Sequence, residues 1–376
     1  MKISFDLRFA HLPGGGGVYT AELLKALVRT RPQIRWHIYH NPESRRQQAV
    51  ITELSNEGAN LETTAVKAPC LSVRQHWQFR TFHDDADVYH YPHFDMPLGM
   101  RGIPLVMTIH DLYPLTLPGY CSPLKRQYFY RLARHNARRA SRVITISQHT
   151  QRDIQQWLQC PPEKIRLIPQ GYSRQYRPIQ DSRLLAEVRE KHRLPEKFIL
   201  YVGNHKPHKN LARLLEGYRL LPRETRQEYA LVLTGPISQY TKTLQDLAER
   251  LDLRPQVQFL GLIGEEDLPA LYNLASLCVL PSLYEGFGLP LVEAMACGTA
   301  VACSNAAAIP EVVGSAGRLF DPLDPQAISQ AILQAIQNDV GKTGIRQKCL
   351  DQAAKFSWEK TAAQTWQVYQ ELMASQ

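Results

Sequence analysis

The sequence contains no apolar run long enough to cross a membrane. A membrane-spanning helix needs about 20 consecutive, predominantly apolar residues, and polar or charged residues interrupt every apolar stretch of this chain before that length. The first residues, MKISFDLRFAHL, are too charged for a secretory leader, and we expect them to form a buried strand instead. We therefore expect a cytoplasmic protein.

Paired cysteine motifs are absent as well. The seven cysteines are scattered along the chain, and no two of them form a C-x-x-C pair. An odd number without such spacing argues against a disulfide framework and against a cysteine-based zinc site. A reducing, intracellular setting is the simplest interpretation.

Acidic residues are scarce in the first half of the chain. Residues 1–180 carry 24 Lys and Arg against 13 Asp and Glu, whereas residues 181–376 carry 20 against 22. The whole chain has a net charge of +9, and ten of its thirteen histidines precede residue 150. We expect the basic half to meet an anion, and nucleic acid, an acidic membrane surface and a lipid diphosphate are all open at this point.

Strand-like and helix-like segments alternate along most of the chain. Its 376 residues exceed one ordinary core, so we expect two domains. The alternation is typical of parallel sheets with helices on both faces, and it predicts an α/β protein with two doubly wound domains and a cleft between the carboxyl ends of their sheets. The predicted strands are Lys2–Phe9, Trp36–Tyr39, Leu61–Val66, Val88–Tyr91, Pro104–Ile109, Val143–Ile146 and Ile165–Ile168, then Phe198–Val202, Ala230–Leu233, Val257–Leu260, Leu277–Leu280 and Ala300–Cys303.

A polar, proline-bearing stretch from Tyr172 to about Glu196 marks the connection between the domains. We assign residues 1–175 to an N-terminal domain and residues 176–356 to a C-terminal domain. Residues 357–376 form an amphipathic helix that we expect to pack back towards the N-terminal domain.

The most informative stretch is residues 281–301, PSLYEGFGLPLVEAMACGTAV. A strand runs into a glycine-bearing loop, and a helix is expected from Leu289 to Gly298 because proline suits a first helical turn and glycine a helix end. The free amides and dipole of such a helix start favour an anion. Glu285 and Glu293 add two carboxylates that accept hydrogen bonds from hydroxyls. This combination suits a nucleotide sugar better than a bare nucleotide.

A cationic motif, YVGNHKPHKNL, ends the first strand of the second half. Lys206, His208 and Lys209 precede a predicted helix, where cations oppose the helix dipole unless an anion binds. A diphosphate would supply that anion, with lysine acting as a point charge. Solvated surface lysines are the alternative interpretation.

Four glycines, Gly14–Gly17, follow the first strand and precede a helix, at the position where backbone approaches a phosphate in related folds. Their spacing differs from the dinucleotide fingerprint, and a plain flexible turn is the alternative. We favour a contact to phosphate or acceptor, with Gly15 and Gly16 as the contacting residues.

His110 and Asp111 stand at the carboxyl end of a predicted buried strand, where a doubly wound domain presents its chemistry. A histidine there can bond to a sugar hydroxyl or exchange a proton with it. A structural histidine beside a helix-capping aspartate is the alternative.

Two short motifs imitate metal or nucleotide sites. Asp85-Ala86-Asp87 is a D-x-D pair, but it precedes a strand and we interpret it as solvated. Residues 341–343, GKT, resemble the end of a P-loop, although Ile336 occupies the position of the first glycine. We therefore expect no metal site.

A predicted helix from Pro123 to Ala140 is both basic and aromatic, which favours docking to an anionic membrane face. A solvated helix face is the alternative. The residues concerned are Lys125, Arg126, Arg131, Arg134, Arg138 and Arg139, with Tyr128, Phe129 and Tyr130 between them.

Taken in order, these motifs resemble the retaining glycosyltransferases of family four, which have the GT-B fold, and the resemblance covers essentially the whole chain. Residues 281–301 are similar to the E-x7-E segment of that family, with Glu285 and Glu293 at the glutamate positions. The glycine loop, the strand-end His110-Asp111, the run VITISQHT and the motif KPHKN also stand in the family's order.

The resemblance implies that the second domain binds most of a nucleotide-diphosphate sugar. Lys209 matches the phosphate-binding lysine, Glu293 the glutamate that takes ribose hydroxyls, and Glu285 a residue that holds the sugar. The implied donor residues are Gly15, Gly16, Asn204, Lys206, Lys209, Leu262, Ile263, Glu285, Gly286, Phe287, Gly288, Leu289 and Glu293. His110, Glu285 and Lys209 are the candidate catalytic residues, and Asp111 and Tyr113 lie on the acceptor side.

One departure concerns the phosphate clamp. The family often has arginine after the glycine that ends the first strand of the second domain, whereas Asn204 follows Gly203 here. Lys206 is the residue that we expect to supply the charge.

The implied reaction is a retaining, front-face transfer of a hexose without a metal cofactor, in which the leaving diphosphate helps to deprotonate the acceptor. Our first interpretation is mannose from GDP-mannose, moved to a glycan or lipid-linked glycan at the inner face of the membrane. A glycosyltransferase that uses UDP-glucose or UDP-galactose as its donor is one alternative. A nucleotide-sugar epimerase of the same architecture is another. A nucleic-acid-binding protein is a further one, but we recognise no nucleic-acid module and expect no such partner.

Overall fold

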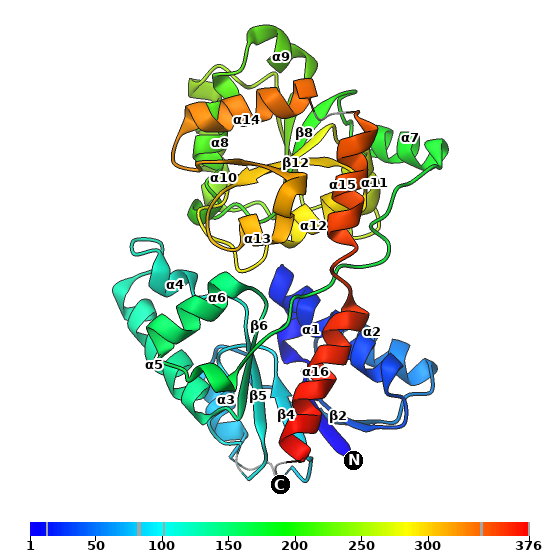
Figure 1. Ribbon diagram of the computed structural model, residues 1–376, viewed down its shortest axis with the longest axis vertical. Helices are drawn as coiled ribbons and strands as arrows, with labels where there is room; N and C mark the ends of the chain where they lie inside the picture. Colours follow the sequence, from blue (N-terminus) through cyan, green and yellow to red (C-terminus); the bar gives the residue numbers. More distant parts are fainter. Residues whose placement is uncertain (13, 81–83, 101, 339–340, 375–376) are drawn as a thin grey trace. The chain divides into compact units, whose positions relative to one another are not determined.

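The computed structural model describes residues 1–12, 14–80, 84–100, 102–338 and 341–374. The chain divides into two compact units, coloured along the sequence in Figure 1. Residues 1–171 and 356–376 form the N-terminal unit, and residues 172–355 form the C-terminal unit.

The N-terminal unit is built on a seven-stranded parallel sheet with the order β3-β2-β1-β4-β5-β6-β7. The strand order reverses between β1 and β4. In sheets of this kind, ligands bind outside the carboxyl ends of the strands at such a switch point. The strands are β1 (Lys2–Asp6), β2 (Arg35–His40), β3 (Leu61–Ala65), β4 (Val88–Tyr91), β5 (Leu105–Ile109), β6 (Arg142–Thr145) and β7 (Ile165–Leu167).

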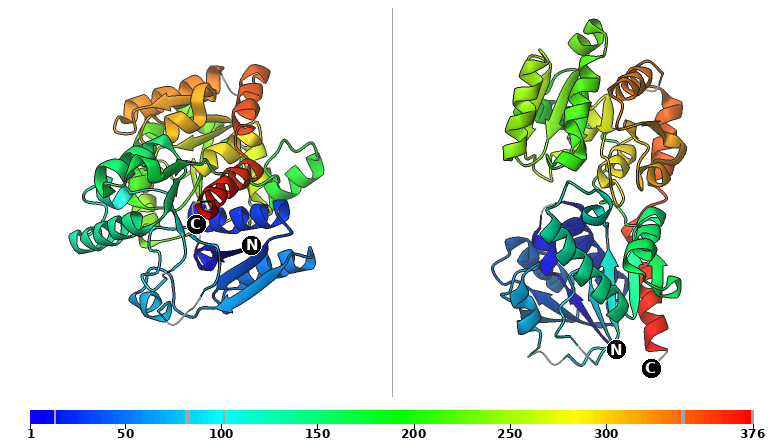
Figure 2. Two further views of the ribbon diagram at one scale, coloured as in Figure 1. Left: turned by 60° about the horizontal axis from the view of Figure 1, so that its bottom comes forward. Right: turned by 90° about the vertical axis from the view of Figure 1, so that its left-hand side faces the viewer.

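Helices lie on both faces of this sheet (Figures 1 and 2). They are α1 (Gly15–Thr30), α2 (Arg45–Asn56), α3 (Val73–Gln78), α4 (Tyr113–Thr116), α5 (Pro123–Arg139), α6 (Gln148–Asp153) and α16 (Trp358–Met373), with shorter turns η1 (Arg8–His11), η2 (Ile154–Leu158) and η3 (Pro162–Lys164). The last helix, α16, packs on α1. The Tyr369 hydroxyl lies 2.6 Å from Nδ1 of the buried His90, so the end of the chain helps to complete the N-terminal core.

The C-terminal unit repeats the arrangement with six parallel strands in the order β10-β9-β8-β11-β12-β13, and its switch point lies between β8 and β11. The strands are β8 (Phe198–Val202), β9 (Ala230–Thr234), β10 (Val257–Gly261), β11 (Leu277–Leu280), β12 (Ala300–Ser304) and β13 (Gly317–Phe320). The helices are α7 (Ser182–Lys191), α8 (Leu211–Arg219), α9 (Arg223–Glu228), α10 (Gln239–Arg250), α11 (Leu268–Leu274), α12 (Leu289–Ala296), α13 (Ile309–Val313), α14 (Pro325–Asn338) and α15 (Thr343–Ala353), with turns η4 (Pro207–Lys209) and η5 (Gly314–Ala316).

The predicted α/β class with two doubly wound parallel sheets is confirmed. Two details of the prediction were wrong. The first strand ends at Asp6 instead of Phe9, because the chain turns at Arg8 and the Arg8 side chain folds back onto Asp6. The edge strand β13 was missed because, of its four residues, only Phe320 is buried.

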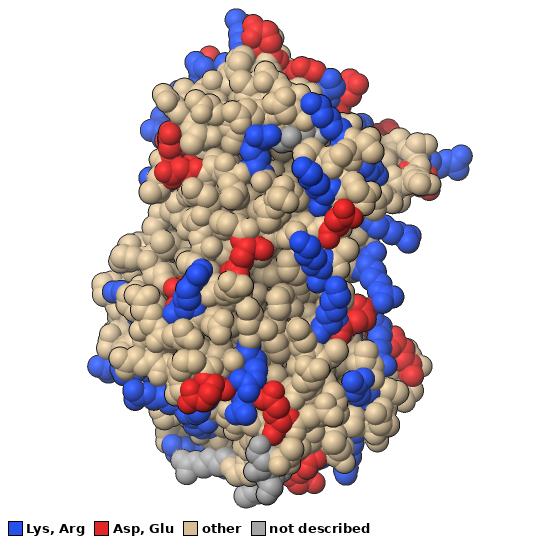
Figure 3. Space-filling model, in the orientation of Figure 1, with Lys and Arg blue, Asp and Glu red and all other residues tan. Residues whose placement is uncertain are grey.

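The described part of the chain contains no helix that is long and apolar enough to span a membrane. On the face drawn in Figure 3, basic and acidic side chains are interspersed. The net positive charge is therefore not gathered into one continuous stripe on that face.

Candidate functional site

A lysine and a glutamate meet at the switch point of the C-terminal sheet. Lys209 ends the turn η4 after β8, and Glu285 lies in the loop after β11. The Nζ atom of Lys209 donates to Oε1 of Glu285 at 2.6 Å, and the hydroxyl of Ser282 donates to the same oxygen at 2.7 Å. Both charged side chains keep some access to solvent, at 15% and 14% exposure. A cation and a carboxylate are thus held at the edge where this fold binds ligands.

The loops that carry this pair are tied together by Asn210. Its backbone has a left-handed φ of 62°. Asparagine adopts this conformation more readily than most residues do. The buried side-chain amide donates to the carbonyl oxygens of Pro281 at 3.0 Å and Pro322 at 2.7 Å. The amide of Leu283 also donates to the carbonyl oxygen of His208 at 2.9 Å. These bonds fix the distance between the β8 and β11 loops before any ligand binds.

The loop after Glu285 forms the start of α12. Gly288 is the residue before the helix and has a φ of 97°, a value that glycine adopts without strain. Gly286, Phe287, Gly288 and Leu289 are buried, and the amide of Leu291 bonds back to the carbonyl oxygen of Gly288 at 2.9 Å. The helix α12 therefore begins at Leu289, as predicted from the sequence. Free first-turn amides and a helix dipole of this kind favour an anion, and anion binding here stays a prediction.

Glu293 occupies a buried position on α12, at 8% exposure. Its Oε2 accepts a hydrogen bond of 2.8 Å from the hydroxyl of Tyr272 on α11. Burial raises the pKa of Glu293 to about 7, although hydrogen bonds from Tyr272 and Tyr176 oppose that rise. The carboxyl group thus titrates near neutral pH and is held in place by an aromatic pair whose rings lie 5.7 Å apart.

The remaining donor candidates of the C-terminal unit lie along the loops of β8 and β10. The backbone carbonyl of Asn204 accepts from the hydroxyl of Tyr201 at 2.9 Å, and its buried Oδ1 has no hydrogen-bond partner among the described residues. Lys206 is exposed. Leu262 is 75% exposed, whereas Ile263 is 5% exposed and turns into the core. The Ile263 side chain is therefore not available to a ligand.

The four glycines of the N-terminal unit have different structural roles. Gly14 caps α1 with a φ of 103°, and Gly15 to Gly17 form the first helical turn instead of a loop. A Cβ on Gly16 would lie 2.7 Å from Cε1 of Phe9, and one on Gly17 would lie 2.0 Å from the carbonyl oxygen of Leu12. Packing therefore requires glycine at both positions. A Cβ on Gly15 would meet only open space.

His110 follows β5 directly. Its Nε2 donates to the carbonyl oxygen of Pro92 at 2.9 Å, which leaves Nδ1 unprotonated in the neutral ring. Burial and the neighbouring His93 lower the pKa of His110 to about 4. His110 is therefore a neutral imidazole at physiological pH, with a lone pair on Nδ1.

Asp111 and Tyr113, the acceptor-side candidates, contact one another through the backbone. Oδ1 of Asp111 accepts from the amide of Tyr113 at 3.3 Å, at the start of α4. Burial and the Asp111 carboxylate raise the pKa of the Tyr113 hydroxyl. Asp111 lies one residue before Leu112, the N-cap of α4, so this bond closes a local turn and Asp111 itself is not the helix cap.

The described residues thus form two sets. Lys209, Glu285, Glu293 and the start of α12 lie together in the C-terminal unit, whereas His110 and the glycine turn lie in the N-terminal unit. The described residues contain no cluster of three or more His, Cys, Asp or Glu with the arrangement of a metal site.

Sequence reasoning missed several residues of these sets. Ser282 and Tyr272 support the two glutamates, but single serines and tyrosines carry no motif. His93 was also missed, although it stands two residues past the predicted strand Val88–Tyr91, in the same kind of position as His110.

Comparisons with known proteins extend over both units. The family model described as "Glycosyl transferases group 1" matches residues 186–356, and the one described as "Glycosyltransferase Family 4" matches residues 13–176. The O-antigen chain mannosyltransferase B of Escherichia coli is 33% identical, over 98% of this chain and 99% of its own length. The MMP alpha-(1->4)-mannosyltransferase of Mycolicibacterium hassiacum is 30% identical, over 74% of this chain and 68% of its own.

A solved structure extends this likeness to the fold. The sucrose-phosphate synthase of Thermosynechococcus elongatus superposes with a TM-score of 0.79 at 22% identity, over 100% of both chains.

Proposed function

The chain belongs to the glycosyltransferases of family 4, and from this membership we propose that it transfers mannose from GDP-mannose to a glycan or lipid-linked glycan. It is a hexosyltransferase with the GT-B fold. The identity of 33% to a mannosyltransferase of O-antigen chains, over nearly the full length of both proteins, supports mannose as the sugar. The single structural observation that carries the site is the Lys209–Glu285 pair beside the start of α12.

The proposed reaction retains the anomeric configuration and occurs on one face of the sugar. The acceptor oxygen bonds to the anomeric carbon while the bond from that carbon to the diphosphate breaks, and the acceptor proton passes to the leaving diphosphate. The ammonium group of Lys209 has three N–H donors, and one is used by Glu285. The other two are available to phosphate oxygens, alongside the first-turn amides of α12. These preorganised donors stabilise the charge that develops on the diphosphate.

The two glutamates would bind different parts of the donor, apart from its diphosphate. Glu285 would accept hydrogen bonds from sugar hydroxyls next to the phosphate that Lys209 holds. Glu293 would bind the ribose hydroxyls through its carboxyl group, which Tyr272 and Tyr176 hold in place. Lys206 would add a second positive charge, since Asn204 brings none.

The proposal requires no divalent metal, because Lys209, Lys206 and the helix amides supply the positive charge at the diphosphate. Transfer should therefore proceed at its full rate in excess EDTA. Activity that disappears with EDTA and returns with manganese would contradict this part of the proposal.

A panel of nucleotide sugars tests the donor. Thermal unfolding is measured with GDP-mannose, UDP-glucose and UDP-galactose, and transfer is measured to octyl α-mannoside as the probe acceptor. A ligand at about 100 times its dissociation constant adds about 2.7 kcal/mol to the free energy of unfolding. We expect this stabilisation from GDP-mannose alone. Stabilisation and transfer with a UDP-sugar instead would assign the alternative donor.

Two further readouts separate the mechanism from its alternatives. The anomeric configuration of the product, measured by NMR, tests retention. Incubation of the donor without acceptor tests the epimerase alternative, because an epimerase would convert the free nucleotide sugar completely.

One face of α5 supports a contact with an anionic membrane. Of the six basic residues on this helix, three bond within the unit: Arg126 to the carbonyl oxygen of Leu115, Arg134 to the hydroxyl of Tyr130, and Arg139 to the carbonyl oxygen of Pro97. The other three are exposed: Lys125, Arg131 and Arg138, here called the α5 cations. They flank two exposed apolar side chains, Leu124 and Tyr128. We propose that this face meets anionic lipid headgroups and that the protein works at the inner face of the membrane.

A further inference from the structure

The switch point of the N-terminal sheet carries a histidine that the donor site does not use. In the C-terminal unit, Lys209 and Glu285 follow β8 and β11, the two strands at its switch point. The corresponding strands of the N-terminal unit are β1 and β4. Phe9 lies in the turn after β1, and His93 follows β4. The fold therefore places His93 where a doubly wound sheet binds its ligand.

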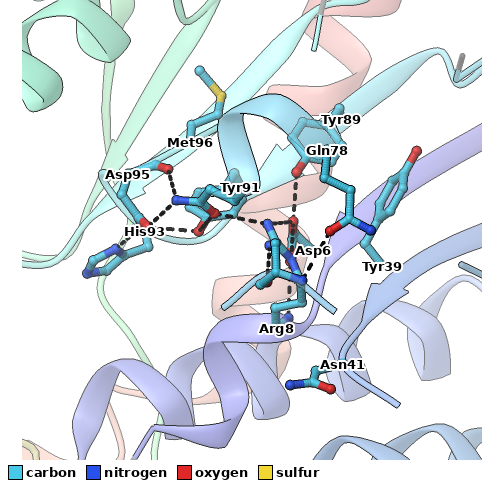
Figure 4. Close-up of polar contacts among 12 residues, drawn as sticks. Asp6, Arg8, Tyr39, Asn41, Gln78, Tyr89, Tyr91, His93, Asp95 and Met96 are labelled. Carbon is cyan, nitrogen blue, oxygen red and sulfur yellow. Dashed lines mark hydrogen bonds and ion pairs between the residues drawn. The ribbon is translucent and has the colours of Figure 1, made fainter. Parts of the chain in front are cut away.

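His93 is held by contacts on two sides. Its Nδ1 is hydrogen-bonded to Oδ1 of Asp95, and its ring stacks on Phe9 with 3.8 Å between centroids. Phe9 in turn packs against Gly16 at the start of α1, where a Cβ would lie 2.7 Å from the ring. In Figure 4 the second ring nitrogen, Nε2, points away from the cluster. Nε2 has no hydrogen-bond partner among the described residues, and the side chain keeps 13% exposure.

Asp95 holds this ring in one orientation. The carboxylate is fully buried, and it accepts from the Leu71 amide at 2.6 Å, the Gln75 side chain at 2.8 Å and the Tyr91 hydroxyl at 3.1 Å. Although burial opposes ionisation, His93 and these donors hold the pKa of Asp95 at about 2. Because Asp95 has no proton to give, His93 must donate from Nδ1. Nε2 is then the ring nitrogen that is left for a ligand.

A second buried pair supports the same network (Figure 4). The guanidinium of Arg8 donates to both oxygens of Asp6, at 2.8 and 2.9 Å, and to Oε1 of Gln75 at 3.3 Å. Arg8 and Asp6 are 1% and 0% exposed. Buried ion pairs of this kind often add no net stability over apolar residues of similar volume. A network that adds no net stability can still serve to hold the His93 ring accurately in place.

His110 lies beside His93, with 6.3 Å between ring centroids. Its Nε2 is bonded to the carbonyl oxygen of Pro92, the residue before His93. Each imidazole is thus anchored through one nitrogen, and the other ring nitrogen is left for a ligand. Two such nitrogens at adjacent strand ends can form hydrogen bonds with the hydroxyl groups of a sugar.

We propose that His93 contacts the acceptor glycan through a hydrogen bond between Nε2 and a hydroxyl of its terminal sugar, and that Asp95 is the positioning residue for that contact. This proposal rests on the proposed function only in taking a glycan as the acceptor. It adds a specificity-determining residue to the acceptor side, where sequence reasoning had named Asp111 and Tyr113. His93 orients the hydroxyl, and the proton still leaves with the diphosphate.

The test compares two substitutions of His93 with a matched surface control. In His93→Asn, the amide can still donate to Asp95, but no atom replaces Nε2. We expect the acceptor KM for octyl α-mannoside to rise, and kcat/KM to fall about tenfold or more, as for the loss of one hydrogen bond to a buried group. Hydrolysis of the donor by water, measured without acceptor, should stay within about twofold, since roughly 0.4 kcal/mol is a factor of two. Gln227→Asn, at an exposed position of α9 in the C-terminal unit, is the control and should change neither rate.

The longer variant His93→Gln places an amide near the position of Nε2 and should recover part of the transfer rate. A folded His93→Asn protein with unchanged acceptor kinetics would overturn the proposal. So would a lowered melting temperature with equal loss of hydrolysis and transfer, because that pattern belongs to a purely structural histidine. Wild-type turnover on the donor panel tests the proposed function separately, and the ratio of variant to wild type is measured with whichever donor that panel selects.

Discussion

The ammonium nitrogen of Lys209 lies 2.6 Å from a carboxylate oxygen of Glu285, although 76 residues separate them in the chain. The two residues follow β8 and β11, which are neighbours only because the strand order of the C-terminal sheet reverses there. Both loops are cross-linked by Asn210 and by the Leu283 amide. In the proposed function, the positive charge for the diphosphate would therefore be in position before the donor binds, and the Glu285 carboxylate would be in position for the sugar.

Replacing Glu285 by alanine should abolish most transfer while the fold persists. The substitution removes the carboxylate that orients both Lys209 and the sugar, and loss of one preorganised contact of this kind costs about 100-fold or more in kcat. Steady-state transfer to octyl α-mannoside measures the effect, and circular dichroism reports the fold. Glu228→Ala, which removes the exposed ion pair with Lys197, is the matched control. Near-wild-type turnover in Glu285→Ala would remove Glu285 from the site.

Glu293 should make stability fall as the pH rises from about 4.5 to about 7. Its carboxyl keeps its proton up to about pH 7 in the folded chain, but it ionises near 4.5 in the unfolded chain. The unfolded state therefore binds fewer protons within this window, and the free energy of unfolding decreases by up to about 1.4 kcal/mol per pH unit from this group.

The variant Glu293→Gln isolates this contribution, because glutamine can still accept from Tyr272 but does not titrate. Denaturant unfolding of both proteins at pH 5 and pH 7.5 measures the difference. The wild-type free energy should decline relative to that of the variant. Parallel pH dependence in the two proteins would show that Glu293 does not titrate in this range.

Alanine substitutions at two glycines in the first turn of α1 should separate the packing role of this turn from its functional role. Gly17→Ala forces a Cβ to within 2.0 Å of the Leu12 carbonyl oxygen, so we expect a loss of about 1–3 kcal/mol in unfolding free energy. Gly15→Ala meets open space and should not lower stability. If the first turn of α1 contacts a substrate, Gly15→Ala will still lower kcat/KM for transfer. Thermal unfolding and transfer kinetics on both variants check this, and an unaffected rate in Gly15→Ala would exclude that contact.

Reversing the α5 cations to glutamate should release the protein from anionic membranes. Each basic residue near an anionic surface contributes about 1 kcal/mol of binding, so the triple variant should lose at least about 3 kcal/mol. Co-sedimentation with phosphatidylglycerol vesicles at low and high salt measures binding of the full chain. Wild-type binding should also weaken with salt.

The control carries the same charge change on exposed residues of the C-terminal unit, Arg219, Arg223 and Lys242. It should bind vesicles as the wild type does. Equal losses in both triple variants would mean that net charge governs binding, and not the face of α5.

Local sequence signals were sufficient for the class of fold and for the ends of several helices. Ser122 caps α5 as predicted, accepting from the Lys125 amide, and α12 begins at the predicted Leu289. The spacing of Glu285 and Glu293 pointed to one helix start because both residues lie on one short segment. Caps, glycines and periodic apolar residues act over a few neighbours, so the sequence displays them directly.

Contacts between distant segments were decided only by the tertiary structure. Lys209 meets Glu285 because β11 pairs with β8, and His93 lies beside Phe9 because β4 pairs with β1; no local pattern states either pairing. Burial also set the chemistry, since the low pKa of His110 and the high pKa of Glu293 both follow from desolvation. The sequence by itself determined the residue types, their local spacing and the family. Strand order and burial, which depend on the whole chain at once, decided which of those residues lie together.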